Sequence, residues 1–116
     1  MSYDVLSDLT KYMSEKLSVP ASTRVPTREP KEFITVTRTG GSSTIGWDTA
    51  NLAVQSWSTT DASAYKLALA IRLLLLECWQ ELDKVIKVEV QSIYDFPDPD
   101  SKKYRYQLDV YITTRL

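Results

Sequence analysis

The chain has 116 residues, enough for a single domain that buries a hydrophobic core without disulfides or bound metal. Its 14 basic and 15 acidic side chains leave a net charge of -1, which excludes a global field that would draw it onto nucleic acid or anionic lipid. It contains no histidine, and its one cysteine, Cys78, lies in an apolar run that favours a buried thiol over a reactive one. We therefore expect a protein that acts through its surfaces, not an enzyme, with no cofactor and no metal site.

The chain begins without the basic and apolar regions of a secretory signal, so we expect no signal peptide. Its longest apolar stretch, residues 67–76, has about half the length of a membrane span and contains Arg72. We expect no membrane partner.

The first predicted element is an amphipathic helix from Tyr3 or Asp4 to Leu17, with Ser2 as its expected N-cap and Pro20 as its stop signal. Apolar side chains recur every three or four residues along it: Val5, Leu9, Tyr12 or Met13, and Leu17. Residues 21–25, between two prolines, predict a short edge strand or a loop.

A β-hairpin is predicted next. Residues 32–39 alternate in polarity with Ile34 and Val36 facing inward, and residues 49–58 form the expected partner strand. Residues 40–46 hold all three glycines of the chain. Because glycine is the most flexible residue, we expect this segment to be the most mobile loop.

Thr60 or Asp61 is expected to cap a second helix over residues 62–82. Apolar residues occupy most of its circumference, which predicts burial against the sheet on one side and against the first helix or a neighbouring subunit on another. Trp79 is expected in the core, and Trp47 is the tryptophan expected at the surface.

Two long alternating strands, residues 84–94 and 103–115, are predicted to close the chain, and their ends are expected to project or to pair with another chain. The element order α-β-β-β-α-β-β predicts one α+β domain over residues 1–116. Its two helices should pack on one face of a mostly antiparallel sheet.

The connection between these strands carries two candidate motifs. Asp95, Asp98 and Asp100 offer oxygen ligands, but the segment lacks the glycine and terminal glutamate of a calcium loop, so a solvated turn is the better interpretation. Residues 102–106 interleave basic and aromatic residues, as in nucleic-acid sites. Alternation sends the basic and aromatic side chains to opposite faces, which favours ordinary strand packing.

Several segments follow one another along the chain in a recognisable order. They are residues 19–26 (VPASTRVP), 28–36 (REPKEFITV), 40–41 (GG), 48–50 (DTA), 52–58 (LAVQSWS), the alanine- and leucine-rich helix, and 97–101 (PDPDS) before a tyrosine-rich last strand. This pattern covers nearly the whole chain. It resembles the tail terminator (tail completion) proteins of long-tailed bacteriophages and prophages.

The resemblance implies a structural virion protein, assembled in the cytoplasm of the bacterial host. Such proteins form a ring, commonly a hexamer, at the head-proximal end of the tail, either from rings in solution or from monomers that assemble on the tail. The ring stops polymerisation of the tail tube and provides the surface that joins the head. The implied partners are other copies of this chain, the tail tube protein and the head–tail connector, while DNA passes through the ring without tight binding.

Two loops are expected to face these partners. The first contains Arg38, Thr39, Gly40, Gly41, Ser42, Ser43 and Trp47. The second contains Asp95, Asp98, Asp100, Lys102 and Lys103.

Two other functions stay open from the sequence. A head-completion or connector protein of the phage neck would also form rings, and only its partner would differ. A small-molecule-binding α+β module would need a concave apolar pocket with a few convergent polar groups.

Overall fold

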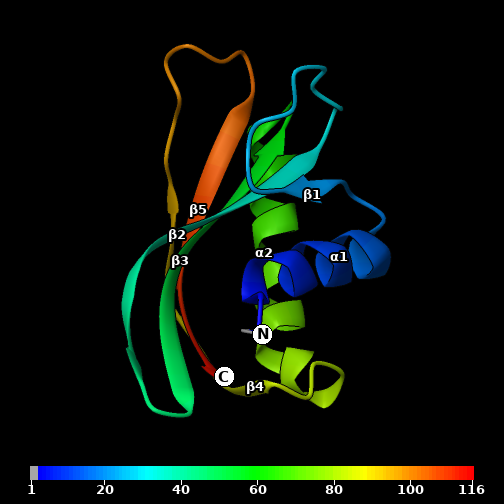
Figure 1. The fold of residues 1–116 in the computed structure, drawn as a ribbon. Coiled ribbons are helices and arrows are strands. Elements are labelled where there is room, and N and C mark those ends of the chain that lie inside the picture. Colours follow the sequence, from blue (N-terminus) through cyan, green and yellow to red (C-terminus); the bar gives the residue numbers. More distant parts are fainter. Residues whose placement is uncertain (1–2) are drawn as a thin grey trace.

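The computed structural model describes residues 3–116 as a five-stranded sheet with two helices on one of its faces (Figure 1). In chain order the elements are α1 (Val5–Leu17), β1 (Ala21–Ser22), β2 (Phe33–Thr44), β3 (Trp47–Ser58), α2 (Asp61–Glu77), the 3-10 helix η1 (Cys78–Gln80), β4 (Val85–Asp95) and β5 (Tyr104–Arg115). This order confirms the predicted α+β fold. Within these residues, no helix combines the length and apolarity needed to cross a membrane.

The strands lie in the order β1-β2-β3-β5-β4. The two-residue β1 pairs in parallel with the start of β2, and every other neighbouring pair is antiparallel. One cross-strand row of the central strands joins Val36, Val54 and Leu108, all fully buried. The sheet therefore has its apolar centre under the helices.

Helix α1 begins at a side-chain cap. Asp4 accepts a hydrogen bond from the Ser7 backbone N–H at 3.1 Å and is the N-cap, whereas the expected cap, Ser2, lies outside the described residues. The helix ends at Ser18, which adopts a left-handed φ of 55° and whose N–H donates to the Ser14 carbonyl. Its apolar stripe then faces the sheet, as the periodicity predicts.

The prediction that residues 40–46 form a mobile loop is wrong. Strand β2 continues to Thr44, and the chain reverses in a two-residue turn at Ile45 and Gly46. Glycine has a low strand propensity, which argues against a strand in this segment. In the structure Gly40 nevertheless pairs with Asn51, and the pairing of β2 with β3 continues to the turn.

Helix α2 is capped by Thr60, whose hydroxyl accepts a hydrogen bond from the Ser63 N–H at 3.1 Å. It is shorter than predicted, because the chain tightens into η1 after Glu77. The expectation that Trp79 lies in the core is also wrong, since this residue of η1 is 57% exposed.

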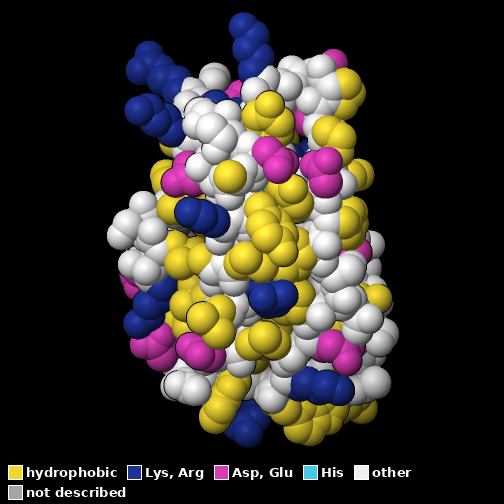
Figure 2. Space-filling view, turned by 180° about the vertical axis from the view of Figure 1, so that it is seen from behind, with side chains coloured by type: hydrophobic (Ala, Val, Ile, Leu, Met, Phe, Trp, Pro, Cys, Tyr) yellow, Lys and Arg dark blue, Asp and Glu magenta, His cyan; other side chains and the backbone are white. Residues whose placement is uncertain are grey.

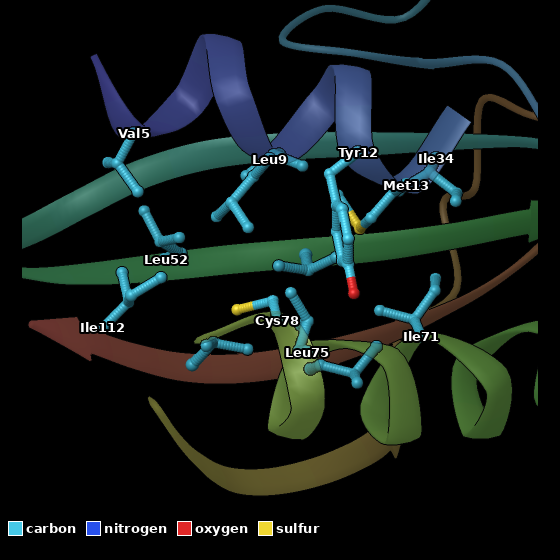
Figure 3. Packing of buried hydrophobic residues seen from close by; sticks show 14 of the residues in the cluster. Val5, Leu9, Tyr12, Met13, Ile34, Leu52, Ile71, Leu75, Cys78 and Ile112 are labelled. Carbon is cyan, nitrogen blue, oxygen red and sulfur yellow. The ribbon is translucent and has the colours of Figure 1, made fainter. Parts of the chain in front are cut away.

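The core lies between the two helices and the sheet (Figure 3). Leu9 and Met13 of α1 meet Ile71 and Leu75 of α2 over the strands, and all four side chains are fully buried. Cys78 is buried beside them, and this burial raises the pKa of its thiol to about 11. Cys78 is therefore a core residue, as its apolar surroundings in the sequence indicate.

Candidate assembly surfaces

The far half of the β2–β3 hairpin, residues 37–51, is the first candidate surface, and we call it the distal hairpin. From Thr37 to Trp47 every residue is exposed, and this part of the hairpin stands apart from the helices (Figure 1). The structure brings the first predicted contact group together here: Arg38, Thr39, Gly40, Gly41, Ser42, Ser43 and Trp47. They lie on a paired hairpin and not on a loop.

An ion pair fixes the distal hairpin across its two strands. The Arg38 guanidinium donates from Nη1 to Asp48 Oδ2 at 2.7 Å and from Nη2 to Asp48 Oδ1 at 2.9 Å. Ser43 Oγ donates to the same carboxylate at 2.6 Å, and Arg38 Nε donates to the Gly40 carbonyl at 3.1 Å. These bonds bridge the β-bulge between Arg38 and Gly40.

The same contacts shift the ionisation of both partners. The Arg38 guanidinium lowers the pKa of Asp48, with a further contribution from the Ser43 hydroxyl, while burial of the carboxylate opposes the shift. The hydrogen bonds from Arg38 to Asp48 raise the pKa of the Arg38 guanidinium. The bidentate pair therefore stays ionised at neutral pH and holds the bulge in place.

Two glycines are required by the backbone of this hairpin. Gly41 has a φ of 128°, and a Cβ added there would lie 2.1 Å from the Thr49 carbonyl oxygen. Gly46 has a φ of 89° in the turn and open space around it. The glycines thus permit a close strand approach and a tight turn, and they do not mark a mobile segment.

The end of the hairpin is apolar. Ile45 in the turn is 101% exposed and the neighbouring Trp47 is 49% exposed. Leu116, half exposed, lies beside them because its N–H donates to the Gly46 carbonyl at 3.0 Å. Sequence reasoning missed Ile45, although a β-branched residue before a turn glycine is an available signal, since turns favour small or polar residues.

The outer face of α2 is the second candidate surface. Four apolar residues follow one another there at helical spacing, and we call them the outer stripe: Tyr65, Leu69, Leu73 and Leu76. Leu73 is 61% exposed and Leu76 is 45% exposed. Figure 2, which views the molecule from behind, shows hydrophobic side chains gathered in a vertical band down this face. The sheet and α1 therefore cover only one side of this apolar helix.

The connection between β4 and β5 is the third candidate surface and lies at the opposite end of the sheet from the hairpin turn. The register places Tyr104 opposite Ser58, at one end, and Arg115 opposite Trp47, at the other (Figure 1). The molecule is 43 Å long and about half as wide. The two predicted contact groups therefore lie too far apart to form one site.

A backbone hydrogen bond and an ion pair lie in the β4–β5 connection. The Asp100 N–H donates to Asp98 Oδ1 at 3.0 Å, which is the solvated turn that the sequence favours. Lys103 Nζ lies 3.7 Å from Glu29 Oε1, which makes an ion pair. The neighbouring Lys102 is exposed. Among residues 3–116, acidic and cysteine side chains form no group of three that could hold a metal ion.

The guanidinium of Arg105 stacks on this end of the sheet. It lies 4.9 Å from the Trp57 ring centre and 4.4 Å from that of Phe96, and its Nε donates to the Phe96 carbonyl. Trp57 in turn stacks on Phe33 at 5.1 Å. A small aromatic cluster on the helix-free face of the sheet thus supports the connection.

The rest of the helix-free face is polar. A hydrogen-bonded row crosses the strands from Thr35 through Gln55 and Gln107 to Tyr94, with donor–acceptor distances of 2.8–3.0 Å. This face was not predicted as a feature, although the alternation of polar residues in the strands signals it. It gives the sheet an ordered polar surface, which also carries the Asp109 carboxylate as an acceptor for Tyr94 and Gln107.

The chain matches no known family model, and no curated protein matches its sequence. Its fold is similar to that of a chain in the solved virion of a native gene transfer agent particle. The TM-score is 0.65, the sequence identity is 12%, and the match covers 99% of this chain and 87% of the other. At this identity the likeness establishes a shared fold.

The hollow between α1 and the residues that follow η1 bears on the small-molecule alternative. Charged side chains line most of it, among them Lys11 and Glu15, and the ion pair between Lys16 and Glu81 spans it at 2.8 Å. A ligand module would need an apolar pocket. This hollow does not have that character.

Proposed function

We propose that this protein is a structural component of a phage or phage-like virion, and specifically a tail terminator. In this role it forms a ring at the head-proximal end of the tail, stops polymerisation of the tail tube and joins the tail to the head. The observation that carries the proposal is the fold likeness to a virion chain over 99% of this chain. The sequence resemblance to tail terminators supplies the specific role.

The arrangement of the surfaces supports this role. A tail terminator must meet the tube on one side and the head connector on the other. Residues 37–43 of the distal hairpin and the β4–β5 connection lie toward opposite ends of a molecule 43 Å long, so one can meet each partner. The apolar outer stripe lies on a third surface and remains for contacts between subunits.

The chemistry of the chain agrees with a structural role. Histidine is absent from the sequence, and the one thiol is buried with a raised pKa. The net charge of -1 suits a ring through which DNA slides without tight binding. We assign the protein no catalytic activity and no cofactor.

The test is deletion of the coding sequence in the strain that carries it, followed by electron microscopy of the released particles. The proposal predicts tails of irregular, often excessive length and heads without tails, with normal particles restored by the wild-type chain. Regular tails that fail only to join heads would favour the neck connector. Normal particles would exclude both roles.

A further inference from the structure

We propose that the tip of the distal hairpin, Ile45 and Trp47, packs on the outer stripe of α2 in a second copy of this chain. Copies then join head to tail. This inference rests on the proposed ring, names the surfaces that build it, and leaves residues 37–43 of the hairpin to meet the tube or the connector.

The tip has the character of an inserting group. Ile45 exposes its whole side chain and Trp47 half of its own, at a turn where polar or small residues are the rule. The backbone behind them is held by the Arg38–Asp48 pair and by the close strand approach at Gly41. Because the hairpin is already ordered, little conformational entropy is lost when the tip binds.

The outer stripe has the character of a receiving surface. Tyr65 is 44% exposed, and by helical spacing it forms a row along α2 with Leu73, Leu76 and the partly exposed Leu69. Figure 2 shows a band of hydrophobic side chains on this side of the molecule. Side chains of this size at these exposures present roughly 300 Å² of apolar surface, the size of patch that marks interfaces on monomers.

This area suits the centre of one subunit contact. A standard interface buries about 800 Å² per partner, with an apolar centre and a polar rim. Lys66, Arg72 and Glu77 are exposed beside the stripe and would form such a rim. The stripe is therefore large enough for the centre of a stable contact but not for a whole interface.

The hairpin tip and the outer stripe are different surfaces of the chain, and this difference decides the symmetry of the contact between copies. Asp48 and Ala50 point toward the helices, so alternation turns Trp47 to the helix-free side of the sheet, away from the outer stripe of its own chain. A two-fold contact between two stripes would leave both tips exposed. Head-to-tail contacts cover one tip and one stripe on every copy, and a closed ring leaves neither surface exposed.

Disulfide cross-linking between two single variants tests the contact directly. Ile45→Cys and Leu73→Cys, carrying tags of different mass, are mixed at concentrations up to the solubility limit and oxidised with copper phenanthroline. The native Cys78 is buried and does not interfere. The inference predicts a mixed disulfide dimer in the mixture and none with either variant alone.

The control replaces Lys31, which is exposed just before β2 begins, at the end of the sheet opposite the hairpin tip. Lys31→Cys mixed with Leu73→Cys should give no cross-link. Dimers of Leu73→Cys alone would replace the head-to-tail contact by a two-fold one. Absence of the mixed dimer, or equal cross-linking of the control, would overturn the inference.

Sedimentation velocity separates this inference from the proposed function. Ile45→Asp and Leu73→Asp should each raise the concentration for half-association at least tenfold, because a charge in an apolar interface centre is left without a partner. Lys31→Asp should leave this concentration unchanged, and circular dichroism checks that all three variants fold. Rings that persist in Ile45→Asp would overturn the inference while leaving the tail-terminator role to the deletion experiment.

Discussion

The glycines of the distal hairpin allow a graded test of its rigidity. An alanine Cβ at Gly40 would meet its nearest neighbour, Asn51 Nδ2, at an ordinary 3.7 Å. At Gly46 it would meet nothing, but the backbone φ of 89° is strained for alanine. At Gly41 the φ of 128° is combined with a 2.1 Å approach to the Thr49 carbonyl oxygen, which cannot move without breaking the strand pairing.

These differences give an order of stability. Gly40→Ala should change the free energy of unfolding by less than about 1 kcal/mol, because the lower entropy of the unfolded chain favours alanine. Gly46→Ala should cost about 1 kcal/mol, since backbone strain of about 1–3 kcal/mol is partly offset by the same entropy. Gly41→Ala adds a backbone overlap to that strain and should cost at least about 3 kcal/mol.

Urea unfolding followed by circular dichroism measures the three values. Hydrogen exchange at the amides of residues 40–51 shows whether Gly41→Ala unfolds only the distal hairpin. Equal stability of the three variants and the wild type would show that the backbone requires glycine at neither Gly41 nor Gly46. It would mean that residues 40–46 are the mobile loop that the glycine content suggests.

Three further predictions concern the core, the ion pair and the thiol. Leu75→Ala should lower the free energy of unfolding by about 2–5 kcal/mol because the side chain is fully buried, whereas Leu73→Ala should change it by less than about 0.5 kcal/mol. Urea titrations of both variants check this, and equal losses would contradict the burial. Asp48→Asn should cost about 1–2 kcal/mol at pH 7, a value set between buried and exposed ion pairs because Arg38 is partly exposed. Since Arg38 lowers the pKa of Asp48, the stability difference between the wild type and Asp48→Asn is present above about pH 4 and shrinks as the pH falls through the folded-state pKa of Asp48. Parallel stability–pH profiles of these two proteins would argue against a stabilising Arg38–Asp48 ion pair. Cys78 should resist a thiol reagent at pH 8 until the protein unfolds, because burial raises its pKa to about 11; rapid labelling of the native protein would show that η1 opens.

The order of elements could be predicted because their signals are local. Apolar spacing defines α1 and α2, Thr60 provides a cap, and strict alternation defines β5. The extent of β2 could not be predicted, because the requirement for Gly41 arises from contact with Thr49 in another strand. Local propensity does not contain that information.

The exposure of α2 shows a second limit. A helix that is apolar nearly all round gives no indication of which side the sheet covers, so Leu73 and the buried Leu75 look equivalent in the sequence. The same ambiguity applies to Trp79, which is expected in the core but is exposed in the structure. The contact residues were predicted as neighbours in sequence, and the structure adds that the two groups lie at opposite ends of the sheet.

Cryo-electron microscopy of particles from the strain that encodes the chain tests the tail-terminator role most directly. We expect a ring of copies of this fold between the last ring of the tail tube and the head connector, with residues 37–43 of the hairpin and the β4–β5 connection facing opposite partners. A particle that lacks this fold, or that carries it away from the head-proximal end of the tail, would exclude the tail-terminator role.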